Sequence, residues 1–237
     1  MLKTNDLLEA GIDEAGRGPL FGRVYAGVCI WNPEIKTDLI RDSKKLSARK
    51  RQIAYDFIKE NAIDYAVGWE DEKTIDKINI LQATQSAMHK GIRELLVRPV
   101  HLLVDGNFFR AYIDEEGRNI PHTCVERGDS EYISIAAASI LAKVEHDKYI
   151  EDMCDKYENL DEFYGLRSNK GYGTKKHMDG IKKYGVTEWH RKSFRPCHRP
   201  SKFGCQGISS PPIVGGSWGA PKKLKNKFNR KIFKCPL

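Results

Sequence analysis

Short apolar runs that end at glycines alternate with helical patterns along the first 195 residues of the chain. One apolar run leads into the sequence GIDEAGRG at 11–18, and a β-branched run covers 24–31. We predict a strand at each place, with the two strands paired across the glycine turn. The same reasoning predicts further strands at 65–69, 101–106 and 123–125.

Helical spacing of apolar residues fills most of the segments between these strands. Ser47 is the predicted N-cap of a first helix, whose apolar face carries Ile53, Ala54, Phe57 and Ile58. A second helix is predicted with a core-facing stripe of Leu81, Thr84, Met88, Ile92 and Leu95. A long helix begins near Glu131, and a last helix is capped by Thr174 and ends near Gly185. Strands that alternate with helices predict an α/β fold.

The chain has 237 residues, of which 40% are hydrophobic, enough for one sizeable domain plus an appendage. It shows neither a signal peptide nor a run of about 18 apolar residues, so we expect a soluble, cytoplasmic protein with no membrane association. Its six cysteines are irregularly spaced and form no CxxC pair, which favours reduced thiols in that compartment.

The formal net charge of +8 is concentrated at the end of the chain. Residues 196–237 contain nine Lys and Arg and no Asp or Glu, which leaves 31 basic and 32 acidic residues in 1–195. Six of the ten prolines and five of the twenty glycines also lie in 196–237. We therefore predict one domain over 1–195 and a flexible, basic, low-complexity tail over 196–237. The tail residues Cys197, His198, Cys205 and Cys235 fit no standard zinc-finger spacing.

The first candidate for chemistry is the carboxylate pair Asp13 and Glu14. Neighbouring side chains on a strand point to opposite faces, so the two acids share one site only where the strand ends and turns. Gly16 and Gly18 permit positive φ and a close approach of the backbone to a ligand, and Arg17 adds a fixed cation. This combination indicates metal and phosphate. The alternative for such a pair is a hairpin turn with two solvated acids.

Two further acids follow predicted strands. Asp105 stands at the carboxyl end of an apolar run, where open α/β sheets place their ligands, although it could also cap the following turn. Asp129 follows a glycine before the long helix, and taken alone it would be that helix's N-cap. We predict that Asp105 joins the pair at the end of the first strand.

Polar residues spaced by four interrupt the apolar long helix. Ser139, Lys143 and Asp147 form this stripe, and the flanking segment 135–141 looks buried on most sides. The stripe is therefore either solvated or directed at the site. Further along, Tyr172 stands between two glycines with lysines after it, a pattern that suits stacking on a nucleotide. An ordinary glycine turn whose tyrosine packs on the body remains the alternative.

Seven motifs in the chain stand in the order of one family. They are DEAGRG at 13–18, DSKKL at 42–46, LVDG at 103–106, GD at 128–129, AASILAKVEHD at 137–147, NKGYGTKKH at 169–177 and HRKSF at 190–194. From about residue 10 to residue 196 the chain resembles ribonuclease HII, the type 2 ribonuclease H family. The resemblance implies a ribonuclease H-like mixed sheet flanked by helices, with a small C-terminal helical part. It also implies hydrolysis of the RNA strand in RNA/DNA hybrids and incision 5′ of single ribonucleotides embedded in duplex DNA.

The resemblance implies a role for individual residues as well. It makes the catalytic, metal-binding carboxylates Asp13, Glu14, Asp105 and Asp129. It gives recognition of the ribonucleotide to Gly16, Arg17 and Gly18, stacking on the next sugar to Tyr172, and a supporting role to Asp147. Further candidates for substrate contacts are Ser43, Lys44, Lys143, Lys175 and Lys176, with plain surface positions as the alternative for at least half of the lysines.

Four carboxylates form a hard oxygen cage that suits Mg²⁺ or Mn²⁺. Two such ions about 3.5–4 Å apart can activate a water and stabilise the leaving 3′ oxygen, so no protein base is required. The expected protein is a monomeric endonuclease of DNA replication and repair that leaves 5′-phosphomonoesters. Two alternatives stay open: a type 3 ribonuclease H, against which the GRG triplet argues, and a nucleic-acid-binding module without activity.

Overall fold

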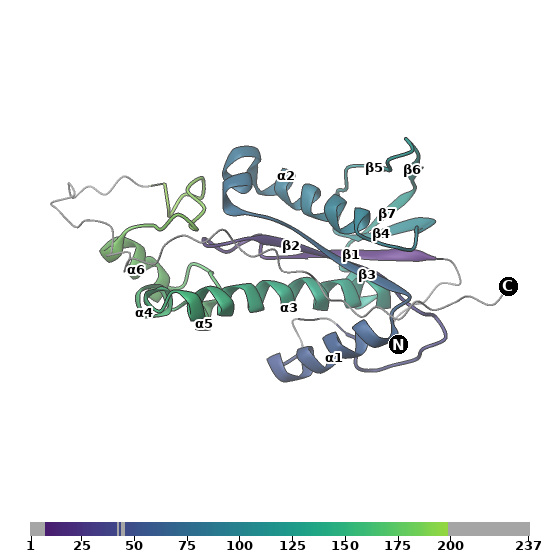
Figure 1. Ribbon diagram of the computed structural model, residues 1–237, viewed down its shortest axis with the longest axis horizontal. Helices are drawn as coiled ribbons and strands as arrows, with labels where there is room; N and C mark the ends of the chain where they lie inside the picture. The colour runs from purple at the N-terminus through teal and green to yellow at the C-terminus, as the bar shows by residue number, and fades with distance from the viewer. Residues whose placement is uncertain (1–7, 42, 44–45, 199–237) are drawn as a thin grey trace. The chain divides into compact units, whose positions relative to one another are not determined.

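The computed structural model describes residues 8–41, 43 and 46–198 (Figure 1). Lys44 and almost all of the predicted basic tail therefore lie outside the described residues. The described chain forms a mixed sheet with helices on both faces, as the sequence predicts. No helix within these ranges is long and apolar enough to cross a membrane.

Five strands form the central sheet, in the order β3-β2-β1-β4-β7. Their bounds are β1 Glu9–Ala15, β2 Val24–Ile30, β3 Asp64–Glu70, β4 His101–Asp105 and β7 His122–Val125. β1, β2 and β3 pair in antiparallel fashion, whereas β4 is parallel to both β1 and β7. The five predicted strands are thus confirmed. A small hairpin of β5 (Tyr112–Ile113) and β6 (Asn119–Ile120) was not predicted.

The helices are α1 Ala48–Asn61, α2 Glu72–Arg93, α3 Ile133–Lys156, α4 Asn159–Tyr164, α5 Leu166–Asn169 and α6 Lys175–Tyr184, with a 3₁₀ turn, η2, at Gly128–Ser130. Figure 1 shows α2 on one face of the sheet and α3 on the other, with α1 beyond α3. The predicted caps are confirmed: Ser47 caps α1, Thr174 caps α6, and α6 ends at Gly185.

The predicted stripe on α2 needs one correction. The helix begins at Glu72, well before the first residue of that stripe, and Asn79 interrupts it with a φ of 67°. Leu81, which follows this break, is 40% exposed instead of facing the core, and Leu95 lies beyond the end of α2 at Arg93. Thr84, Met88 and Ile92 are buried as expected.

Small residues let α3 lie directly on the sheet. A Cβ at Gly11 would stand 2.1 Å from the backbone carbon of Ser134, and one at Gly27 would stand 2.1 Å from the carbonyl oxygen of Ala138. Ile12, the neighbour of Gly11, instead belongs to the apolar cluster formed with α2. The pleat of β1 therefore sends odd-numbered residues toward α3 and even-numbered residues toward α2.

Candidate active site

The register of the two central parallel strands brings two predicted acids together. Ile12 of β1 pairs with Val104 of β4, and both side chains lie in the cluster on the α2 face. The next residue of each strand, Asp13 and Asp105, therefore points to the opposite face, at the carboxyl edge of the sheet. This is the edge at which parallel strands of α/β proteins place their ligands.

Asp13 is a buried acid beside other acids. Burial raises the pKa of its carboxyl group well above the ordinary value, and the charges of Glu14 and Asp105 raise it further. Hydrogen bonds oppose this rise, because Ser139 of α3 donates to the carboxylate and the Glu14 N–H lies 2.7 Å from Asp13 Oδ1. The ionised form of Asp13 therefore needs a cation beside it.

Glu14 does not lie where the strand turns, which corrects the expectation from the sequence. The ladder between β1 and β2 continues past Glu14 to the pair of Ala15 and Tyr25, so Glu14 still lies within the paired strand, before the turn. Its Oε1 accepts a hydrogen bond of 3.1 Å from Arg17 Nη1. Burial is the largest cause that raises the pKa of Glu14, Arg17 lowers this pKa, and Asp105 raises it again. Both acids of the pair thus interact electrostatically with Asp105.

Asp105 and Asp129 are joined by a short turn. Oδ1 of Asp105 accepts a 2.7 Å hydrogen bond from the Gly128 N–H, which fixes the start of η2 beside the end of β4. A Cβ at Gly128 would lie 2.5 Å from Ile135 Cδ1, so a side chain there would require the end of the Ile135 side chain to move. Asp129 follows and is buried. It does not cap α3, whose N-cap is Tyr132.

The carboxylates suit a hard divalent cation by their chemistry. Their oxygens are the ligand type that Mg²⁺ and Mn²⁺ prefer, and the mutual repulsion recorded in the pKa of Asp13 would be relieved by a positive ion. Among the described residues, no three His, Cys, Asp or Glu side chains already converge closely enough to hold a metal ion. Glu14 is held by Arg17, and Asp105 by Gly128.

The two glycine turns meet at Gly18 and Tyr172. Gly16 has a φ of 86°, as expected for a glycine in this turn, but Gly18 does not need positive φ. It needs space, because a Cβ at Gly18 would lie 3.2 Å from Cε1 of Tyr172. The tyrosine ring, which is 43% exposed, therefore lies against Gly18. Residues more than 150 positions apart in the sequence are brought together here.

The polar stripe of α3 divides between two environments. Ser139 bonds to Asp13, and its Oγ lies 2.9 Å from that of Ser43 in a buried contact, so this part of the stripe faces the acids. Lys143 instead lies 2.7 Å from Asp147, whose other oxygen is 3.5 Å from Arg51. Asp147 thus belongs to a network of ion pairs. The remaining candidate of the DSKKL motif, Lys44, lies outside the described residues.

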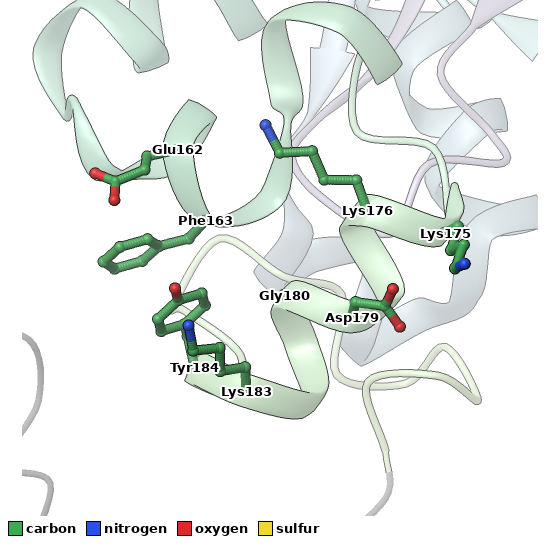
Figure 2. Close-up of a pocket in the computed structure, with 8 residues that line it drawn as sticks. All are labelled: Glu162, Phe163, Lys175, Lys176, Asp179, Gly180, Lys183 and Tyr184. Atoms are coloured by element: carbon green, nitrogen blue, oxygen red, sulfur yellow. The ribbon is translucent and has the colours of Figure 1, made fainter.

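Lysines 175 and 176 lie at a separate hollow between α4 and α6 (Figure 2). The hollow has a volume of about 400 Å³ and is also lined by Lys183 and by Tyr184, which stacks on Phe163 with ring centroids 3.9 Å apart. None of the four predicted carboxylates lines it. Glu162 and Asp179 line it as well, so the hollow is a surface feature of mixed charge, apart from the predicted carboxylates.

Reasoning from the sequence assigned no role to Arg191, which the structure places under the glycine turn. Its side chain is 0% exposed and donates hydrogen bonds to backbone carbonyls on both sides of that turn. The only signal was its place in the HRKSF motif, since backbone carbonyls leave no trace in a sequence.

A mixed sheet with helices on both faces and acids at the carboxyl edge of its central strands is the architecture of the ribonuclease H-like fold. Ribonuclease H2 from Pyrococcus horikoshii has the same fold, with a TM-score of 0.64 and 25% identity over 80% of this chain and 95% of that one. Bst-RNase HIII, solved in complex with Mn²⁺, shares the fold with a TM-score of 0.57 and 20% identity over 81% of this chain and 68% of that one.

The family model of ribonuclease HII matches residues 10–201. Ribonuclease HII of Phocaeicola vulgatus is 46% identical over 189 residues, which cover 80% of this chain and 90% of the relative. The chain belongs to the ribonuclease HII family, and it is therefore a ribonuclease H, a hydrolase that cuts nucleic acid internally. Family membership implies cleavage of RNA/DNA hybrids and incision at ribonucleotides.

Proposed function

We propose that this protein cuts duplex DNA on the 5′ side of single embedded ribonucleotides, hydrolyses the RNA strand of RNA/DNA hybrids, and leaves 5′-phosphate ends. The observation that carries the proposal is the contact of Tyr172 with Gly18, because it places an exposed ring on the turn that follows the acid pair. Family membership supports the same activity.

The four carboxylates Asp13, Glu14, Asp105 and Asp129 would hold Mg²⁺ or Mn²⁺. The bound ions would supply an activated water and stabilise the leaving 3′ oxygen, as in other two-metal sites. The protein's own part is to keep the acids ionised and close, although burial and repulsion favour their protonation. The hydrogen bonds from Ser139 and from the Glu14 N–H serve this purpose at Asp13.

Recognition of the ribonucleotide requires a reader of its 2′ hydroxyl, the group that distinguishes RNA from DNA at one position. The backbone of Gly16, Arg17 and Gly18 can approach that hydroxyl closely. Tyr172, against Gly18, would pack on the sugar of the next nucleotide and favour a deoxyribose there. Arg17 also donates a hydrogen bond to Glu14, so the turn at Gly16–Gly18 is linked directly to one of the acids.

The decisive experiment offers the full chain two substrates with Mg²⁺ or Mn²⁺: a DNA duplex with one ribonucleotide and a continuous RNA/DNA hybrid. We expect cleavage of both, with the cut 5′ of the ribonucleotide in the first. Asp105→Asn is the matched inactive control, because asparagine keeps the acceptor for Gly128 but removes a charged ligand. Loss of a group that hydrogen-bonds a metal ligand costs roughly 10–100-fold at other metal sites, so loss of a ligand itself is expected to cost at least about 100-fold in turnover, with substrate binding retained.

The other outcomes separate the alternatives. Cleavage of the hybrid alone would indicate a type 3 activity. Binding of both substrates without cleavage would indicate a module that only binds nucleic acid. Near-normal turnover by Asp105→Asn would remove Asp105 from the site.

A further inference from the structure

Two neighbouring residues, His190 and Arg191, are each linked by hydrogen bonds to one of the two turns proposed to recognise the substrate, the turn at Gly16–Gly18 and the turn at Tyr172. Both side chains are 0% exposed, so neither can touch nucleic acid. Arg191 contacts the turn that contains Gly16, and His190 reaches the turn that contains Tyr172 through a second histidine. A buried pair that serves both turns is a candidate for setting the distance between them.

The Arg191 guanidinium acts as a template for the first turn. It donates to four backbone carbonyls at 2.6–3.0 Å, those of Gly16, Arg17, Gly22 and Arg23. Burial lowers the pKa of Arg191 to about 10, so the group stays protonated at neutral pH and keeps all of its donors. A planar guanidinium holds several acceptors in fixed directions, which an ammonium group cannot do. The buried Arg191 side chain thus fixes the backbone conformation of the turn through these hydrogen bonds.

A directed chain of hydrogen bonds fixes the second turn. The backbone N–H of Thr187 lies 2.9 Å from His190 Nδ1, so this nitrogen is an acceptor and the proton of neutral His190 is on Nε2. His190 Nε2 lies 3.1 Å from Nε2 of His177, which must accept, so the proton of His177 is on Nδ1. That nitrogen is 3.0 Å from the carbonyl oxygen of Tyr172 and donates to it.

Burial keeps both histidines neutral, which this chain requires. It lowers the pKa of His177, and it lowers that of His190 to about 3, with the neighbouring His177 adding to the effect. Each histidine therefore donates at one nitrogen and accepts at the other throughout the neutral range. The Tyr172 carbonyl is thus anchored to the segment that carries Arg191.

The two turns also meet through the backbone beside the pair. The N–H of Leu20 donates to Gly171 at 2.8 Å, and the carbonyl of Leu20 accepts from the N–H of Arg191 at 2.8 Å. Tyr172 is close enough to Arg191 to influence its pKa. Leu20, Gly171 and Arg191 therefore form one connected backbone unit between the reading turn and the tyrosine.

We propose that His190 and Arg191 are positioning residues that set the separation of Tyr172 from the Gly16–Gly18 turn, and so determine how strongly single ribonucleotides are selected over continuous hybrids. This inference rests on the proposed function. Asp13 and Asp105 are held separately, because they are aligned by the register of β1 and β4, whereas Glu14 is linked to the turn through Arg17. Disturbing the pair should therefore affect selection more than the reaction itself.

The test compares Arg191→Lys with Arg195→Lys, the same change at an exposed arginine four residues further on. The value of kcat/KM is measured on the embedded ribonucleotide and on the continuous hybrid. A misplacement of about 1 Å can cost roughly 100-fold, so Arg191→Lys is expected to lose roughly 10- to 100-fold on the embedded ribonucleotide and less than about 3-fold on the hybrid. Arg195→Lys should match the wild type on both substrates.

A second pair of variants covers the possibility that Arg191→Lys does not fold. His177→Asn keeps a donor near the position of Nδ1, whereas His177→Leu removes it. We expect the asparagine variant to retain more of the preference for the embedded ribonucleotide than the leucine variant. Thermal unfolding with and without Mg²⁺ accompanies each variant, and the increase in Tm caused by Mg²⁺ should equal that of the wild type.

Equal losses on both substrates, or a reduced response of Tm to Mg²⁺, would make His190 and Arg191 ordinary structural residues and overturn the inference. If the wild type itself fails to cut at the embedded ribonucleotide, the proposed function fails and the inference fails with it. If the wild type cuts there and all variants keep its ratio of kcat/KM values, the inference alone is wrong.

Discussion

Asp13 combines burial with the repulsion of two neighbouring acids, and both raise the pKa of its carboxyl group above the ordinary value of 3.8. Between that value and the raised one, the folded protein binds more protons than the unfolded chain. The free energy of unfolding therefore falls as pH rises through this window. The ionised Asp13 therefore lowers the free energy of unfolding of the metal-free protein at neutral pH, and a bound cation would relieve the repulsion that causes this loss.

Asp13→Asn should accordingly stabilise the protein at pH 7.5 in EDTA while it abolishes cleavage. For a chain of this size, each kcal/mol of relieved repulsion raises Tm by roughly 2–4 °C. The advantage should shrink toward pH 4, where the wild-type acid is protonated. Mg²⁺ should raise the Tm of the wild type more than that of the variant. A variant less stable than the wild type at pH 7.5 would contradict this account.

Tyr172 provides a second test of single residues. Tyr172→Ala should lose more kcat/KM on a single embedded ribonucleotide than on a continuous hybrid, because the ring against Gly18 is proposed to sense the following deoxyribose. Tyr184→Ala is the matched control, since this tyrosine is 41% exposed but lies on α6 at the separate hollow. Equal losses on the two substrates would reduce Tyr172 to a packing residue of its turn.

At the scale of elements, α3 depends on glycines in the strands beneath it. A methyl group at Gly27 would overlap the Ala138 carbonyl oxygen, which belongs to the helix backbone and cannot rotate away. Gly27→Ala should therefore destabilise the protein by about 3 kcal/mol or more. Gly117→Ala is the control that separates steric overlap from backbone strain. Its φ of 76° is strained for alanine, but nothing lies within 4 Å of the added carbon. It should cost only about 1–2 kcal/mol.

Urea unfolding of the two glycine variants beside the wild type gives both free energies. Similar costs would mean that α3 can shift to make room, and that Gly27 is not required for its position on the sheet.

Elements defined by local signals were predictable from the sequence, whereas relations across the fold were not. Ser47 and Thr174 could be predicted as N-caps because each side chain accepts a hydrogen bond from a backbone N–H only three residues further along the chain. The break of α2 at Asn79 was missed although it has a local signal, because asparagine tolerates positive φ and the Asn79 side chain accepts from the Gln82 N–H. Arg191 was missed for a different reason: its acceptors are carbonyls up to 175 positions away, and any residue type carries a carbonyl.

The acids illustrate the same division within the site. Asp105 could be predicted because an apolar strand delivers it to the sheet edge. The continuation of the strand past Glu14 could not, because it depends on how far β2 pairs along β1. Gly18 was expected to permit positive φ and a close approach of the backbone to a ligand; its φ is not positive, and the ring of Tyr172 lies against it.

At the scale of the whole molecule, the net positive charge of the sequence comes from residues after the described part of the chain. Nine Lys and Arg follow Pro196, and the described chain continues to Cys197, which is buried and donates from its thiol to the Leu20 carbonyl. A deletion that tests the tail should therefore begin after His198. It should leave a cooperative thermal transition.

Deleting 199–237 should weaken binding to all duplexes alike and flatten the dependence of log Kd on log salt. Each phosphate contact that is lost reduces that slope by about 0.9. Titrations of a plain DNA duplex and a hybrid at several salt concentrations measure the effect. An unchanged slope would show that the tail does not bind phosphates, and loss of the cooperative transition would show that it belongs to the core.

The link from His190 and Arg191 to the turn near the start of the chain also sets an order of events during synthesis. Asp13, Asp105 and Asp129 all leave the ribosome before His190 and Arg191, which follow Asp129 by roughly 60 residues, or about 3–12 s of translation. A nascent chain thus carries the acids before the contacts that fix its reading turns. A fragment that ends between Asp129 and His190 keeps the acids but lacks the pair that positions the two turns.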